Sequence, residues 1–366
     1  MKFGLFMMPL HHPTENPTLA FQRDLQLIEY VEGLGFEEIW VGEHHTGGWE
    51  TIPSPDIFIS AAAQRTKRIR IGTGVVSLPF QHPFLVAERM AFLDHLTYGR
   101  TMLGIGPGVL PADAKLFGID ASQLRPMLNE ALEIILKLYQ EPGPVTFEGE
   151  HWTLKDMALQ LKPYQKPHLP LAVASAGGSN SLELAGKYGL LLLSALFSVG
   201  QTTEGLAQAW EKVEEAAQAN GRTANREDWR VASYVYVADT TQGALDDIRS
   251  GSSREEDEYL AHTGYPWPGR VWMVGDPDHV ARQIKSLEDE TGGFGGLLLV
   301  SPEWTSTEKW NHSLDLFARY VMPQFQDSLG PVRGAYERMV HDNEAGLLGN
   351  PASQPAPSPS EKTFVD

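Results

Sequence analysis

Short apolar segments recur along the chain, and polar or glycine-marked stretches separate them. Most of these segments are continuously apolar instead of alternating, which is typical of strands that are buried on both faces of a parallel sheet. We therefore predict eight strands, at residues 2–8, 36–42, 68–78, 101–106, 170–176, 190–197, 229–238 and 295–301.

Helical patterns fill most of the gaps between the predicted strands. Apolar residues follow one another at spacings of three and four within 21–34, 86–93 and 124–138. The segment 275–287 begins a further helix, with Asp276 as its N-cap and Pro277 at its first position. Eight strands that alternate with helices predict an α/β fold, a closed (β/α)8 TIM barrel, with an open doubly wound sheet as the alternative.

Two regions depart from this alternation. Residues 239–270 form a long, acidic insertion between strands 7 and 8, which we interpret as a candidate mobile lid; a solvated surface excursion is the alternative. The barrel is expected to span residues 1–326, and residues 327–366 would form a C-terminal extension. Its last part, 349–366, is rich in Pro, Ser and Ala, which predicts disorder.

Composition narrows the classes of function. The 366-residue chain has a net charge of −18, which disfavours nucleic acid and anionic membranes as partners. It has no cysteine, which excludes disulfides and thiolate chemistry, and no apolar run approaches the length of a membrane span. The opening "MKFGLFMMPL" weakly resembles a signal peptide, but it has no cleavage site, so we expect a buried first strand in a cytoplasmic protein.

The stretch "VGEHHTGGWE" (41–50) places Glu43, His44 and His45 after the second strand, where the active sites of such barrels lie. Consecutive strand residues point to opposite faces, so the two histidines should not share a metal ion, and we expect no metal site. A histidine that faces a ligand pocket suits proton transfer, because its ordinary pKa is near neutrality. A packing histidine is the alternative interpretation.

The stretch "SAGGSNSLELAG" follows the fifth strand and opens a helix. Gly177 and Gly178, followed by Ser179 and Ser181, leave free backbone N–H groups and small hydroxyls at a helix N-terminus, which is a site for an anion such as phosphate. The alternative is an ordinary turn with a serine N-cap.

Glycines also mark the ends of strands three and four. The segment "GIGPG" lacks the spacing of a dinucleotide-binding fingerprint, and we reject that function for it. Gly74 and Gly106, at adjacent strand ends, would instead let a wide, flat ligand approach the backbone.

Several segments, in the same order, resemble landmarks of the bacterial luciferase-like, flavin-dependent monooxygenases. They cover roughly residues 1–326 and are "MKFGLFMMP", "EEIWVGEHHT", "IRIGTGVVSLPFQHP", "LDHLTYGRTMLGIGPG", "LAGKYG", "MVGDPDHVARQI" and "YVMPQF". The segments "GWE", "VVSLPFQHP" and "GIGPGVLPADA" most resemble the limonene monooxygenase branch.

This resemblance implies a TIM barrel, assembled as a homodimer, that receives reduced flavin from a separate NAD(P)H-flavin reductase. The cofactor would be reduced FMN, with FAD as an alternative. Oxygen would add to the flavin to give a C4a-peroxyflavin, which would oxygenate a small, apolar substrate such as a terpene. The protein would bind and orient this cofactor chemistry.

The resemblance also assigns residues. His44 would lie beside the reactive flavin face, with Glu43 and His45 as its companions in "EHH", and Asp113 would be an acidic residue of the strand-four loop. Gly74 and Val75 would lie against the isoalloxazine, where luciferases carry a non-proline cis peptide. Ser181, Gly177 and Gly178 would form the phosphate site. The remaining cofactor-binding candidates are Ser77, Gly106, Gly108, Ser175 and Ser179.

One position departs from the family pattern. Pro107 stands where the luciferases have an arginine that covers the phosphate, so either another cation does this work or the flavin binds more weakly. Two other functions remain as alternatives: a coenzyme F420-dependent hydride-transfer oxidoreductase on the same barrel, and a non-catalytic flavin-binding partner subunit. The presence of the "EHH" and "GGSNS" segments argues against the second.

Overall fold

The computed structural model describes residues 1–8, 10–196, 202–263 and 272–348. These residues belong to two compact units, Met1–Met322 and Pro323–Asp366. The first unit holds the sheet and the helices around it. The expected boundary after residue 326 stays a prediction, and the tail 349–366, expected to be disordered, lies outside the described residues.

Within the described residues, eight parallel strands close into a barrel, because β10 pairs with both β9 and β12. This arrangement confirms the predicted TIM barrel and excludes the open sheet. The strands are β1 (Lys2–Met7), β2 (Glu38–Val41), β3 (Arg70–Thr73), β5 (Thr101–Gly106), β8 (Leu171–Ser175), β9 (Leu191–Ala195), β10 (Trp229–Val237) and β12 (Gly296–Val300).

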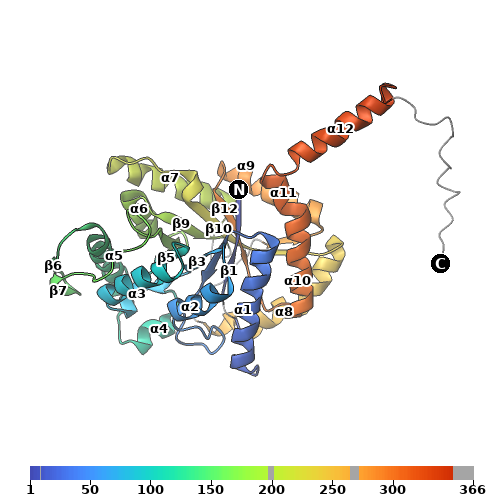
Figure 1. Cartoon of the computed structure of the whole chain (residues 1–366). Helices are drawn as coiled ribbons and strands as arrows, with labels where there is room; N and C mark the ends of the chain where they lie inside the picture. Colours follow the sequence, from blue (N-terminus) through green and yellow to red (C-terminus); the bar gives the residue numbers. More distant parts are fainter. Residues whose placement is uncertain (9, 197–201, 264–271, 349–366) are drawn as a thin grey trace. The chain divides into compact units, whose positions relative to one another are not determined.

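Helices surround the barrel (Figure 1). They are α1 (Pro17–Leu34), α2 (Pro55–Arg65), α3 (Pro83–Leu96), α5 (Leu124–Gln140), α6 (Ser179–Tyr188), α7 (Thr203–Ala219), α8 (Thr241–Glu258), α9 (Pro277–Thr291) and α10 (Thr307–Leu316). Helix α9 begins as predicted, since the Asp276 side chain accepts from the N–H of His279 and Pro277 follows it. It ends at Gly292, whose left-handed backbone stops the helix.

Several elements were not predicted. A hairpin of β6 (Val145–Glu148) and β7 (Thr153–Met157) precedes β8, and β11 (Trp272–Gly275) and α4 (Pro111–Leu116) are short additions. The predicted strand 68–78 is divided into β3 and the short β4 (Val76–Ser77). Helix α11 (Met322–Phe325) begins at the last residue of the first unit, and α12 (Gly330–Glu344) belongs to the second unit. Much of the expected insertion 239–270 is helix α8, and residues 264–270 of the insertion lie outside the described part; its function as a lid stays a prediction.

A buried ion pair lies inside the barrel, toward the start of the strands. The guanidinium of Arg230 on β10 donates to both carboxylate oxygens of Glu38 on β2, each at 2.8 Å. Both side chains are almost completely buried. The pair therefore ties together strands that are separated by β12 and β1 in the sheet.

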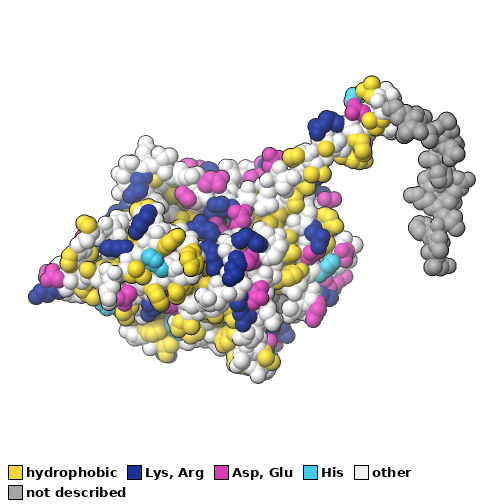
Figure 2. Space-filling view, in the orientation of Figure 1, with side chains coloured by type: hydrophobic (Ala, Val, Ile, Leu, Met, Phe, Trp, Pro, Cys, Tyr) yellow, Lys and Arg dark blue, Asp and Glu magenta, His cyan; other side chains and the backbone are white. Residues whose placement is uncertain are grey.

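The surface mixes charges of both signs. Figure 2 shows acidic and basic side chains interspersed on one face, with Lys and Arg gathered near its centre, although the whole chain is acidic. Among the described residues, no helix is both long enough and apolar enough to cross a membrane.

Candidate active site

A cavity of about 790 Å³ opens at the carboxyl ends of the barrel strands. Residues from the ends of β1, β2, β5, β8 and β9 line it, together with the segment around β4 and the start of α5. This volume lies in the range of pockets that hold drug-sized ligands and cofactors. The predicted position of the site, at the carboxyl ends of the strands, is therefore where the structure has its large cavity.

His44 lines this cavity and lies between two buried carboxylates. Its Nδ1 donates to Oδ2 of Asp113 at 3.0 Å, and its Nε2 lies 3.4 Å from Oε2 of Glu50. β2 ends at Val41, so both histidines lie in the loop after it, as predicted, but the alternation of strand side chains used to separate them does not apply in that loop. Even so, His44 lines the cavity, and the residues found to line it do not include His45.

The carboxylates set the charge of His44. Burial alone would lower the pKa of His44, but the nearby charges of Glu50 and Asp113 and the hydrogen bond to Asp113 outweigh burial and raise the pKa. Burial would likewise raise the pKa of Asp113, but the hydrogen bonds from His44 and Thr46 lower it. The imidazolium and the carboxylate therefore stabilise each other, and His44 carries a proton above the pH at which an ordinary histidine loses it.

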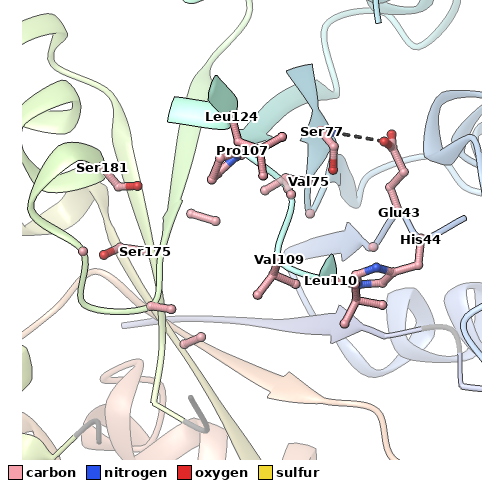
Figure 3. A pocket seen from close by; sticks show the side chains of 18 of the residues that line it. Glu43, His44, Val75, Ser77, Pro107, Val109, Leu110, Leu124, Ser175 and Ser181 are labelled. Atoms are coloured by element: carbon pink, nitrogen blue, oxygen red, sulfur yellow. Dashed lines mark hydrogen bonds between the residues drawn. The ribbon is translucent and has the colours of Figure 1, made fainter. Parts of the chain in front are cut away.

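Glu43 and His45 support the loop instead. Glu43 accepts hydrogen bonds from the backbone N–H of Ser77 and the side chain of Gln81, at 3.2 and 3.1 Å. His45 Nε2 lies 3.3 Å from Glu43, and its ring packs edge-on against Phe117. Figure 3 shows Glu43 directed toward Ser77, whereas the His44 ring lies beside Leu110. Within the described residues, no group of three His, Asp or Glu side chains could hold a metal ion.

The other side of the cavity has a helix N-terminus, serine side chains and an arginine. Gly178 is the N-cap of α6 and leaves the first-turn N–H groups without a side-chain cap. Ser175 and Ser181 lie near one another on this side, across the cavity from His44 (Figure 3). Arg125, near the start of α5, also lines the cavity, and its Nη2 is 3.6 Å from the position that a Cβ on Gly178 would occupy. Arg125 thus places a cation at the start of α6, which the sequence did not reveal.

The ends of β3 and β5 contain a cis peptide bond and two closely packed glycines. The Gly74–Val75 peptide bond is cis, at the place where the family resemblance implied a non-proline cis peptide. A Cβ at Gly106 would lie 2.7 Å from Cγ2 of Val75, and a Cβ at Gly74 would lie 2.9 Å from Cβ of Trp40. These glycines are therefore required by the packing of neighbouring strands, which is a reason that the sequence interpretation did not consider.

Most of the expected site residues line the cavity. They are Glu43, His44, Gly74, Val75, Ser77, Gly106, Gly108, Ser175, Gly177, Gly178 and Ser181. The residues found to line it do not include His45, Asp113 or Ser179. Two charged lining residues, Glu50 and Arg125, were not among the expected site residues. Glu50 lies six residues after His44, and the sequence did not indicate that the two are in contact. Arg125 is a single cation at the start of a predicted helix, with no motif around it.

Comparison with known proteins identifies relatives over nearly the whole chain. The luciferase-like monooxygenase family model matches residues 1–293. The 4-hydroxyprotoasukamycin monooxygenase of Streptomyces nodosus subsp. asukaensis is 43% identical over 92% of this chain and 95% of its own length. Limonene 1,2-monooxygenase of Rhodococcus erythropolis is 38% identical over 96% of this chain and 94% of its own length.

Solved structures share the fold. The oxygenating constituent of 3,6-diketocamphane monooxygenase from Pseudomonas putida, a type II Baeyer–Villiger monooxygenase in complex with FMN, matches with a TM-score of 0.77 and 26% identity. The match covers 88% of this chain and 98% of that one. A coenzyme F420-dependent tetrahydromethanopterin reductase from Methanopyrus kandleri has a TM-score of 0.70 and 20% identity over 89% of this chain and 99% of its own, which is a likeness of fold alone.

Proposed function

The chain belongs to the luciferase-like monooxygenase family and is a flavin-dependent monooxygenase; on that premise, we propose that it is the oxygenase component of a two-component system that uses reduced FMN and O2. A separate NAD(P)H-flavin reductase would supply the reduced flavin. One oxygen atom would enter a small, apolar organic substrate and the other would leave as water, with two electrons taken from the reduced flavin. We also propose that the protein is cytoplasmic, because the proposed reductase depends on NAD(P)H.

One observation carries the cofactor assignment: the same cavity has the first turn of α6 and Arg125 on one side and His44, between two carboxylates, on the other. The first turn of α6, Ser181 and Arg125 would hold the phosphate of FMN, and Arg125 would replace the arginine that is absent at Pro107. The ring would then extend toward Val75 and His44. The residues present fit this cofactor.

The reduced flavin, when bound, supplies the electrons and the site of reaction with oxygen. The protein's own contribution is to hold the ring, exclude water and keep a proton on Nε2 of His44 at the cavity edge. Val109, Leu110 and Leu124 give this cavity an apolar wall, which favours an apolar substrate. A terpene-like substrate is consistent with that wall and with the relative that acts on limonene.

We also propose that two copies associate through α2 and α3. Ile57 on α2 and Leu85, Phe92 and Leu96 on α3 are large apolar side chains with 45–70% of their surface exposed. The three α3 positions recur at spacings that share one helix face. An apolar face of this kind is typical of a surface that another protein copy covers.

The function is tested with the purified chain, an added NADH-dependent flavin reductase, FMN and limonene as a probe substrate under ¹⁸O2. We expect one ¹⁸O atom in each product molecule, and no product when the reductase or FMN is omitted. A coupled system that consumes NADH and O2 yet releases only hydrogen peroxide with limonene and with other apolar alkenes and ketones would contradict the proposed substrate class. Failure to bind reduced FMN would overturn the cofactor assignment.

A further inference from the structure

Glu50 is anchored more firmly than its position in a loop suggests. Gly47 and Gly48 both have positive φ angles and reverse the chain, which brings Glu50 back beside His44. Glu50 forms an antiparallel bridge with Leu10, and only 4% of its surface is exposed. Glu50 also lines the cavity. Its position is therefore fixed by the backbone as well as by its side-chain contacts.

Tyr259, just after the end of α8, holds the other oxygen of this carboxylate. Its hydroxyl donates to Oε1 of Glu50 at 2.5 Å, and its ring stacks on Trp49 with centroids 5.6 Å apart. Tyr259 is also buried. Burial and the Glu50 carboxylate raise the pKa of Tyr259, so the hydroxyl keeps its proton and remains a donor.

The two carboxylates beside His44 have different geometry. Asp113 makes a direct hydrogen bond to Nδ1, which fixes the orientation of the ring. Glu50 faces Nε2 at 3.4 Å, and this contact is an ion pair at longer range. Because carboxylates only accept hydrogen bonds, both ring nitrogens of His44 are favoured in their protonated form. Glu43 adds a third negative charge nearby, and Tyr259 remains neutral.

We propose that Glu50, held in place by the Tyr259 hydroxyl, is a positioning residue that keeps His44 charged and keeps the proton on its cavity-side nitrogen. Glu50 acts through His44, and Tyr259 acts through Glu50. This inference rests on the proposed function for its catalytic meaning, but the charge relationship itself exists in the protein without flavin. It also links the end of α8, within the segment 239–270, to the protonation of the active-site histidine.

The test measures the His44 ring directly in the flavin-free protein, by NMR with histidine labelled at the ring carbon. The His44 signal is assigned by its loss in His44→Gln. In Glu50→Gln we expect the midpoint of the His44 titration to move to lower pH, because a facing negative charge is removed. In Tyr259→Phe, which keeps the stack on Trp49, we expect a smaller shift in the same direction.

Tyr236→Phe is the matched control. Tyr236 also donates to a carboxylate, that of Asp247, at 3.1 Å, but Tyr236 and Asp247 do not contact His44. This variant should leave the His44 midpoint unchanged. An unchanged midpoint in Glu50→Gln would overturn the assignment of Glu50, and a midpoint in Tyr259→Phe equal to that of the control would overturn the part played by Tyr259. If Glu50→Gln does not fold, Glu50→Asp gives the same test, since it keeps the charge but withdraws it from Nε2.

A second measurement separates positioning from direct contact with the cofactor. With reduced FMN and the limonene probe, Glu50→Gln should keep the affinity for FMN, and the pH at which product gives way to hydrogen peroxide should move lower. If FMN affinity falls several-fold while the pH profile stays in place, Glu50 touches the cofactor, and its role as a positioning residue is wrong. The NMR result does not depend on flavin, so it stands apart from any failure of the proposed function.

Discussion

Arg230 on β10 and Glu38 on β2 form a two-point ion pair in the interior of the barrel, with both N–O distances at 2.8 Å. Removal of one partner leaves an unpaired charge in a buried position, which typically costs about 3–5 kcal/mol of stability. We expect this loss for Arg230→Met, measured as the free energy of unfolding in urea. The double variant Glu38→Gln/Arg230→Met should recover part of it. A loss below about 1 kcal/mol, the usual value for an exposed pair, would contradict this prediction.

The same pair predicts how stability depends on acid. Burial would raise the pKa of Glu38, but the hydrogen bonds and charge of Arg230 outweigh it and lower the pKa below 4.5, the ordinary value. A carboxyl whose pKa is lower in the folded state contributes stability above its unfolded pKa and loses it as the pH falls through the folded pKa. The difference in unfolding free energy between the wild type and Glu38→Gln should therefore be constant from pH 7 to 5 and shrink below about pH 4. A difference in unfolding free energy that grows as the pH falls would contradict this prediction.

The phosphate site predicts a selective effect on cofactor binding. Arg125→Ala should weaken binding of reduced FMN by about 1.5–3 kcal/mol, and Ser181→Ala by about 1–2 kcal/mol, because each removes a charge-assisted hydrogen bond. Riboflavin, which has no phosphate, should bind the wild type and both variants equally in an anaerobic fluorescence titration. Arg65→Ala, which removes an exposed arginine that pairs with Glu29, is the control. Equal losses for riboflavin and FMN would show that the phosphate lies elsewhere.

His44 predicts a loss of coupling without a loss of flavin. His44→Ala should bind reduced FMN, because the phosphate contacts come from α5 and α6, but it should form product roughly 10²–10⁴-fold more slowly if the histidine is a general acid–base. Hydrogen peroxide should take the place of product, and chelators should have no effect. Product, peroxide and bound flavin are measured in the same sample. Near-normal coupled turnover in this variant would exclude the role.

The apolar face on α2 and α3 predicts the assembly state. Phe92→Glu places a charge in the proposed interface and should convert a dimer to a monomer in sedimentation velocity. Leu19→Glu, at an exposed apolar position on α1, should leave the mass unchanged. If the wild type sediments as a monomer, or if both variants behave alike, the proposed interface is wrong.

The strands were predictable because a buried parallel sheet requires continuous apolar segments, and the capping residues of α9 gave that helix its start. The β6–β7 hairpin was missed because its residues are largely exposed and carry no continuous apolar pattern. β2 was predicted as residues 36–42, whereas the strand is Glu38–Val41. His44 and His45 lie in the loop after it, so the alternation of strand side chains used to separate them does not apply there.

The site was predictable only where residues adjacent in sequence act together. Glu43, His44, Gly177 and Gly178 stand in short motifs at strand ends. The contact between Glu50 and Tyr259 joins residues 209 positions apart and depends on the turn at Gly47 and Gly48. Arg125 was missed for a similar reason. A helical pattern in the sequence predicts which residues share one face of a helix, but it does not predict which loop of the barrel that face contacts.

The separation of the Glu38–Arg230 pair from the cavity has a practical consequence for redesign. The ion pair lies near the amino ends of β2 and β10, whereas Val109, Leu110 and Leu124 come from the connection after β5 and the start of α5. Directed evolution can therefore randomise these three wall positions to recruit bulkier or smaller substrates while the scaffold keeps most of its tolerance to mutation. A library limited to them should yield a higher share of folded variants than one of equal size that includes Glu38 or Arg230.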